Sequence, residues 1–196
     1  MGNIWITSDL HIYHDKEFIW KVRGFNSITE MNDTIVSRWN NLIDKEDDIY
    51  VLGDLMLGDS NKGIEYLKRL NGKIHIVLGN HDTTNREKLY RELPNVVEVA
   101  EVGIRLKYKK YHFIMTHYPM FTGNLDDEGR GLKARIINLC GHSHTIDKYQ
   151  DMDKGIIYHC EADAHDCYPI LIDDIIQDLY NWTKNNILST QTFKEV

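Results

Sequence analysis

Short apolar, β-prone segments of this chain run repeatedly into clusters of Asp, Asn, His and Gly residues. In the first half the segments are residues 3–8, 49–52 and 73–78, and the clusters are Asp9-Leu10-His11, Gly53-Asp54 and Gly79-Asn80-His81-Asp82. Helices are expected between these strands, over residues 30–43, whose apolar side chains recur at helical spacing, and from Asn61 to Leu70. Strand, helix and strand in this order favour right-handed crossovers and parallel pairing, so this half predicts an α/β fold.

The second half of the sequence has a different pattern. Between residues 96 and 115, β-rich segments separated by Gly103 and by Lys109-Lys110 predict antiparallel strands. Residues 136–140 and 156–160 predict two more strands, and residues 173–186 predict a closing helix. Further clusters follow strands here, Thr116-His117 and Gly141-His142-Ser143-His144. Each polar cluster therefore lies at the end of a predicted strand.

Length and composition bound the class of protein. The 196 residues can bury a continuous core and contain no repeat, low-complexity tract or linker, so we expect a single domain over residues 1–196. No apolar run approaches the ~20 residues of a membrane-spanning helix, and three cysteines are the wrong number for a disulfide framework. These features predict a cytoplasmic protein with no membrane partner.

The net charge of −7 argues against non-specific nucleic-acid binding. The sequence does not indicate an oligomeric state.

The spacing of the acidic and imidazole side chains predicts metal binding. In open α/β sheets, ligands bind beyond the carboxyl ends of the strands, so the clusters should meet at one edge. Residues two apart on an extended segment point the same way, so Asp9 and His11 can reach one metal ion. His142 and His144 share this spacing and can serve one site or two neighbouring sites. Imidazole and carboxylate ligands favour manganese, iron, zinc or nickel over an all-oxygen magnesium site.

The order of these motifs resembles that of the calcineurin-like metallophosphoesterase superfamily. The motifs are Asp-x-His, Gly-Asp, Gly-Asn-His-Asp, His and Gly-His-x-His, and they span residues 9–144. The sequences Ser8-Asp9-Leu10-His11-Ile12-Tyr13-His14, Trp39-Asn40, His117-Tyr118-Pro119 and Ala162-Asp163-Ala164-His165-Asp166 are similar to those of its short bacterial and phage members. The resemblance implies a four-layer α-β-β-α sandwich with two mixed β-sheets.

The same resemblance implies a site with two metal ions. Asp9, His11 and His144 would hold the first ion, Asn80, His117 and His142 would hold the second, and Asp54 would bridge the two. A metal-bound hydroxide would then be the nucleophile, and two ions could stabilise an in-line displacement at phosphorus. His81, which is next to a ligand but assigned to no ion, would protonate the leaving oxygen.

The sequence departs from the better-known pattern of the superfamily at one position. Many relatives carry Gly-Asp-x-x-Asp-Arg-Gly, in which the second Asp orients the acid histidine, but Leu57 stands at that place here. Asp59 or Asp82 could supply the carboxylate for His81 instead. Because this chain lacks that second Asp, the sequence argues against a protein serine/threonine phosphatase.

Substrate contacts are expected from Asn80 and His81, and two further residues have alternative interpretations. His14 could contact the substrate phosphate or help to seat the first metal ion, or it could be a solvated loop residue. Arg23 could clamp a phosphate with its forked donors, although a surface ion pair is the commoner role of an arginine.

The sequence thus predicts an enzyme, a metal-dependent hydrolase of small phosphomonoesters or phosphodiesters. A nuclease is an alternative, but the sequence shows no stripe of basic and aromatic residues on which single strands could stack. A non-catalytic scaffold of the same fold is a second alternative. Such a scaffold would be expected to have lost metal ligands, whereas this chain retains them all.

Overall fold

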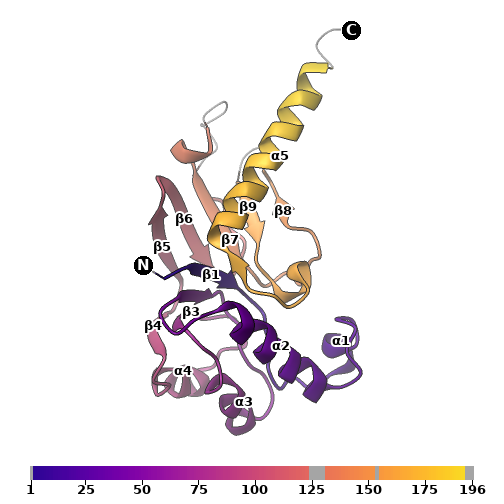
Figure 1. Ribbon diagram of the computed structural model, residues 1–196, viewed down its shortest axis with the longest axis vertical. Helices are drawn as coiled ribbons and strands as arrows, with labels where there is room; N and C mark the ends of the chain where they lie inside the picture. The colour runs from indigo at the N-terminus through magenta and orange to yellow at the C-terminus, as the bar shows by residue number, and fades with distance from the viewer. Residues whose placement is uncertain (1, 124–130, 153–154, 193–196) are drawn as a thin grey trace.

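Two five-stranded sheets form the centre of the computed structural model, which describes residues 2–123, 131–152 and 155–192 (Figure 1). The first sheet has the order β10-β1-β2-β3-β4. Its strands are β1 (Ile4–Thr7), β2 (Asp48–Val51), β3 (Lys73–Val77), β4 (Val96–Ala100) and β10 (Ile170–Leu171). Strands β1 to β4 pair in parallel, and β10 is antiparallel to β1.

The second sheet has the order β5-β6-β7-β9-β8. Its strands are β5 (Gly103–Tyr108), β6 (Tyr111–Thr116), β7 (Ile136–Cys140), β8 (Tyr149–Gln150) and β9 (Ile157–His159). Strands β6, β7 and β9 are parallel, whereas β5 and β8 run antiparallel to their neighbours. Both sheets are therefore mixed, as the resemblance implies.

Helices complete the α/β fold. They are α1 (Glu17–Trp20), α2 (Ile28–Leu42), α3 (Ser60–Leu67), α4 (Thr84–Arg91) and α5 (Ile172–Thr192), with short 3₁₀ turns η2 (Leu132–Ala134) and η3 (Ala162–His165). The Ser27 side chain caps α2 by accepting a hydrogen bond from the backbone N–H of Glu30 (3.1 Å). Asp59, rather than Asn61, caps α3. No described helix combines the length and apolar character needed to cross a membrane.

Two differences from the sequence prediction concern the middle of the chain. Helix α4 is not predicted, because its only fully buried side chain is Tyr90 and it therefore lacks an apolar stripe. Strand β4 pairs in parallel with β3, whereas residues 96–115 as a whole predict antiparallel strands. The two differences are linked, since α4 returns the chain to the end of the sheet at which β3 begins.

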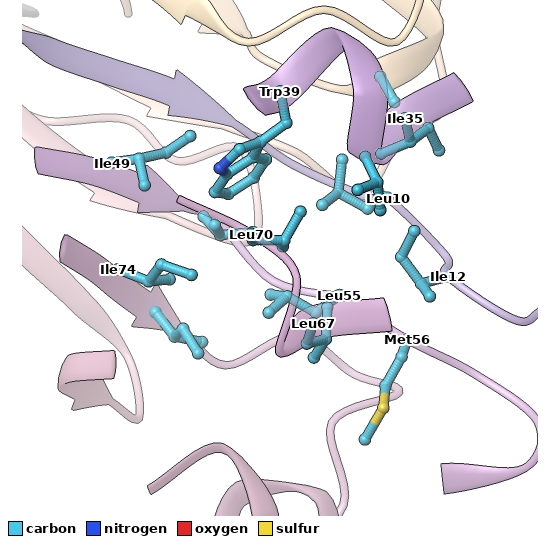
Figure 2. Packing of buried hydrophobic residues seen from close by; sticks show 14 of the residues in the cluster. Leu10, Ile12, Ile35, Trp39, Ile49, Leu55, Met56, Leu67, Leu70 and Ile74 are labelled. Carbon is cyan, nitrogen blue, oxygen red and sulfur yellow. The ribbon is translucent and has the colours of Figure 1, made fainter. Parts of the chain in front are cut away.

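The first hydrophobic core lies between the first sheet and the helices α2 to α4, and it anchors the loops that follow β1 and β2 (Figure 2). Leu10 and Ile12 of one loop and Leu55 and Met56 of the other are at most 1% exposed and belong to the same buried cluster as Trp39. The polar neighbours of these residues, His11 and Asp54, approach each other instead, with Nε2 of His11 3.8 Å from Oδ2 of Asp54.

The second core lies between the two sheets and includes one face of α5. Buried residues from the first sheet, from the second sheet and from the helix contribute to it: Ile6, Tyr50 and Val77; Phe113, Met115, Leu139 and Tyr158; Ile172, Ile175 and Leu179. The hydroxyl of Tyr158 also donates to Asp178 of α5 (2.8 Å). The sheets are thus packed together beneath the edge at which the polar clusters lie.

Candidate metal centre

The loops after β1, β2, β3, β6 and β7 bring the predicted ligands together at one edge of the sheets. Their side chains are Asp9, His11, Asp54, Asn80, His117, His142 and His144. Several of these residues have left-handed backbones, with φ between 48° and 75°: Asp9, His11, Asp54, His142 and His144. Left-handed conformations are costly for residues other than glycine and tend to cluster at functional sites.

Asp9, His11 and His144 form the first group. The two Nε2 atoms of His11 and His144 lie 3.1 Å apart, and Oδ1 of Asp9 lies 3.9 Å and 3.7 Å from them, respectively. The Oδ2 atom of Asp9 accepts hydrogen bonds from the Ser8 hydroxyl (2.6 Å) and from the backbone N–H of His142 (2.9 Å). Its Oδ1 atom is buried and has no hydrogen-bond partner among the described residues. This carboxylate oxygen therefore points toward the two imidazoles without a donor of its own.

Asn80, His117 and His142 form the second group. Oδ1 of Asn80 lies 2.8 Å from Nε2 of His117 and 2.9 Å from Nδ1 of His142, and the two ring nitrogens are 3.2 Å apart. Three potential ligand atoms thus converge on one point.

Asp54 lies between the two groups. Its Oδ2 atom is 3.8 Å from Nε2 of His11 and 3.7 Å from Nε2 of His117. Its Oδ1 atom accepts a hydrogen bond from the backbone N–H of His81 (2.9 Å). One buried carboxylate oxygen is therefore within reach of both groups.

Hydrogen bonds on the far side of the imidazole rings determine which ring nitrogen carries a lone pair. A carbonyl oxygen only accepts, so Nδ1 of His117, 2.8 Å from the oxygen of Leu52, must carry the proton. In the same way, Nδ1 of His144 donates to Asp163 (2.8 Å). In the neutral rings, the Nε2 atoms therefore present lone pairs toward the other predicted ligands, which is the tautomer in which a histidine binds a metal ion through Nε2. Together with the Oδ1 atom of Asp9, unpartnered among the described residues, this donor set fits metal ions.

Burial adjusts the protonation of the first group. Desolvation lowers the pKa of His11 to about 2, so its ring is neutral near pH 7. Desolvation also raises the pKa of Asp9 to about 6, which still leaves this carboxylate mostly ionised at pH 7. These are the protonation states in which both side chains can bind a metal.

Gly141 allows the backbone after β7 to pass close to the Asp9 carboxylate. A Cβ atom at this position would collide with the Ser8 hydroxyl and with Oδ2 of Asp9. We therefore expect Gly141→Ala to weaken manganese binding by about 10-fold or more, because overpacking typically costs 1–3 kcal/mol. Calorimetric titration of the metal-free protein measures this. Gly131→Ala is the matched control, because a Cβ there meets no atom of the described residues within 4 Å. Equal affinity of both variants for manganese would contradict the expectation.

His81 is exposed at the same edge, and neither expected carboxylate contacts it. Its Nε2 atom lies 3.9 Å from Oδ2 of Asp54, and its side chain is 44% exposed. Asp59 caps α3, while Asp82 accepts from the backbone N–H groups of Asp54 (2.8 Å) and Gly79 (2.9 Å). Within the described part of the chain, Asp54 is the carboxylate that faces His81.

The structure places His14 and Arg23 behind the first group of ligands. Nδ1 of His14 is 3.3 Å from Nδ1 of His11, the nitrogen that faces away from the first group. The side chain of Arg23 is only 2% exposed and forms a two-pronged ion pair with Asp163. This geometry does not support the interpretation of Arg23 as a phosphate clamp, and its ion pair is buried rather than on the surface.

Asp163 and Ser8 are the neighbours of the ligands that the sequence reasoning did not assign. Both belong to stretches that resemble the short bacterial and phage phosphoesterases, and this was the only signal available for them. Asp163 lies in η3, and its contacts with His144 and Arg23 depend on the folded chain.

The chain is similar to several known proteins. The chain is 32% identical over 151 residues to an uncharacterized protein of Methanocaldococcus jannaschii, which covers 76% of this chain and 74% of the relative. It is 27% identical over 202 residues to the gene 66 protein of Mycobacterium phage D29, and this alignment covers 92% of this chain and 97% of the phage protein. A crystal structure of a protein of unknown function from Aquifex aeolicus has a similar fold, with a TM-score of 0.63 and 21% identity over 90% of this chain and 99% of that one.

The family model of the calcineurin-like phosphoesterase superfamily domain matches residues 3–159. This match includes all the residues of the two ligand groups and Asp54. The chain therefore belongs to the calcineurin-like phosphoesterase superfamily.

Proposed function

We propose that this protein hydrolyses phosphate esters with two metal ions held by the two ligand groups. The observation that carries the proposal is the position of Oδ2 of Asp54, nearly equidistant from Nε2 of His11 (3.8 Å) and Nε2 of His117 (3.7 Å). Asp9, His11 and His144 would hold the first ion, Asn80, His117 and His142 would hold the second, and Asp54 would bridge them. The mixture of imidazole, carboxylate and amide donors suits manganese, iron, zinc or nickel.

When bound, such a pair of ions lowers the pKa of a shared water molecule and neutralises charge on phosphoryl oxygens. The chain's own residues then have separate tasks. Asp54 fixes the two centres relative to each other, and its Oδ1 atom orients the loop of His81 through the backbone hydrogen bond. His81, exposed beside Asp54, donates a proton to the leaving oxygen of a phosphomonoester or phosphodiester.

Metal-stripped protein tests the proposal directly. It is incubated with an aryl phosphodiester and with an aryl phosphomonoester, with and without added manganese, iron, zinc or nickel. We expect hydrolysis of at least one ester only when a metal is added. Binding of two ions per chain without turnover of either ester would support a non-catalytic scaffold instead.

The role of His81 has its own test. We expect His81→Ala to lower the rate by about 10²- to 10⁴-fold on an alkyl ester, whose leaving oxygen needs a proton. The loss on a nitrophenyl ester should be much smaller, because that leaving group departs without protonation. Rate constants for both esters are measured with saturating metal. Equal losses on the two esters would assign His81 to phosphate binding rather than to proton transfer.

A further inference from the structure

Asp163 connects a predicted metal ligand to a buried arginine. Its Oδ2 atom lies 2.8 Å from Nδ1 of His144 and 2.8 Å from Nη2 of Arg23, while its Oδ1 atom accepts from Nε of Arg23 (3.0 Å). The Arg23 side chain is 2% exposed and that of Asp163 is 14% exposed. A carboxylate paired with a guanidinium is ionised, and each oxygen of Asp163 accepts at least one hydrogen bond from Arg23 or His144.

The remaining donors of Arg23 reach the loop that carries the other ligands of the first group. Nη2 donates to the backbone oxygen of Asp9 (2.8 Å), and Nη1 donates to that of Leu10 (3.0 Å). A single guanidinium thus joins the loop after β1 to the carboxylate behind His144. Its planar, forked donors suit such a connection, since they hold their partners at fixed angles.

An ionised carboxylate only accepts hydrogen bonds, so Asp163 requires the proton of His144 to be on Nδ1. In the neutral ring, the Nε2 atom of His144 then presents its lone pair toward Nε2 of His11 (3.1 Å) and Oδ1 of Asp9 (3.7 Å). We propose that Asp163, anchored by Arg23, is a positioning residue that fixes the ring and tautomer of His144 for the first metal ion. This inference rests on the two-metal site proposed above.

The second group of ligands provides an internal comparison. His117 donates from Nδ1 to the backbone oxygen of Leu52, a contact in which neither Asp163 nor Arg23 takes part. A general loss of stability would weaken both centres, whereas loss of the positioning carboxylate should weaken the first centre alone. The two explanations therefore predict different metal titrations.

The experiment titrates manganese into metal-free, full-length protein by calorimetry. Wild type should bind two ions, and Asp163→Asn should bind one of them about 10- to 100-fold more weakly, the range expected when the partner of a ligating histidine is lost. In a His11→Ala background, which leaves the second centre intact, Asp163→Asn should not change the affinity. Equal weakening of both centres, or no weakening, would overturn the positioning role.

Two further variants keep the test decisive. Asp47→Asn alters another buried carboxylate, which accepts from Asn3 and Trp5 at the opposite end of β2, and it should leave both affinities unchanged. If Asp163→Asn alone does not fold because Arg23 loses its partner, Arg23→Gln combined with Asp163→Asn removes both charges and should show the same selective loss.

The result also separates this inference from the proposed function. If the wild-type protein binds two ions but hydrolyses no ester, the proposed function is contradicted while the role of Asp163 stands. If the wild-type protein binds no manganese, both proposals are contradicted.

Discussion

Asp54→Asn is expected to lower the metal-dependent rate of ester hydrolysis by about a thousandfold. The substitution removes the charge of a carboxylate that lies between both groups of ligands, and its Oδ2 atom is within 3.8 Å of His11 and His117. Metal ions supply several kcal/mol of charge stabilisation in such reactions, and each 1.36 kcal/mol corresponds to tenfold in rate. Asparagine also adopts the left-handed backbone conformation of this position (φ 53°) more readily than most residues, so the fold should be retained.

The measurement combines rate constants with metal content per chain. Asp59→Asn is the matched control, since Asp59 caps α3 on the same loop and asparagine is an equally good cap. The control should keep the wild-type rate and two ions per chain. A wild-type rate for Asp54→Asn would contradict a bridging carboxylate, and a low rate for Asp59→Asn would restore that residue as a partner of His81.

Trp39→Ala is expected to lower the free energy of unfolding by about 3–5 kcal/mol. The indole of Trp39 is fully buried in the first core, to which Leu10 and Leu70 also belong, and its Nε1–H donates to the backbone oxygen of Asn71 (2.8 Å). The substitution leaves both a cavity and an unpaired carbonyl. For a chain of this size, the midpoint of thermal unfolding should fall by roughly 6–20 °C.

Thermal unfolding of metal-free protein measures this loss without a contribution from bound ions. Trp39→Phe should lose less than Trp39→Ala, because it keeps an aromatic ring in the core. Phe18→Ala removes an aromatic side chain that is 67% exposed and should change the midpoint by little. A similar midpoint for Phe18→Ala and Trp39→Ala would show that the first core does not govern stability.

The gathering of the proposed ligands at one edge could be predicted from sequence because each one follows a short apolar strand. Asp9, Asp54 and Asn80 come after strands whose hydrophobic runs are unambiguous, and parallel pairing brings their ends to one edge. The two mixed sheets were implied by the family resemblance, whereas periodicity alone indicated an α/β first half and antiparallel strands in the second half.

The features that could not be predicted depend on contacts between distant parts of the chain. Strand β10 has two residues and exists through pairing with Trp5 and Ile6. The ion pair of Arg23 with Asp163 joins residues 140 positions apart. The pattern around Arg23 is the same for a buried anchor as for an exposed phosphate clamp, so only the folded structure separates the two roles.

The two proposed centres draw their ligands from both sheets. Asp9, His11, Asp54 and Asn80 follow strands of the first sheet, while His117, His142 and His144 follow strands of the second. Each bound ion would therefore link the two sheets. At a free metal concentration 100 times the dissociation constant, one ion would raise the free energy of unfolding by about 2.7 kcal/mol. Selection for stability of the folded chain and selection for hydrolysis would then act on the same side chains.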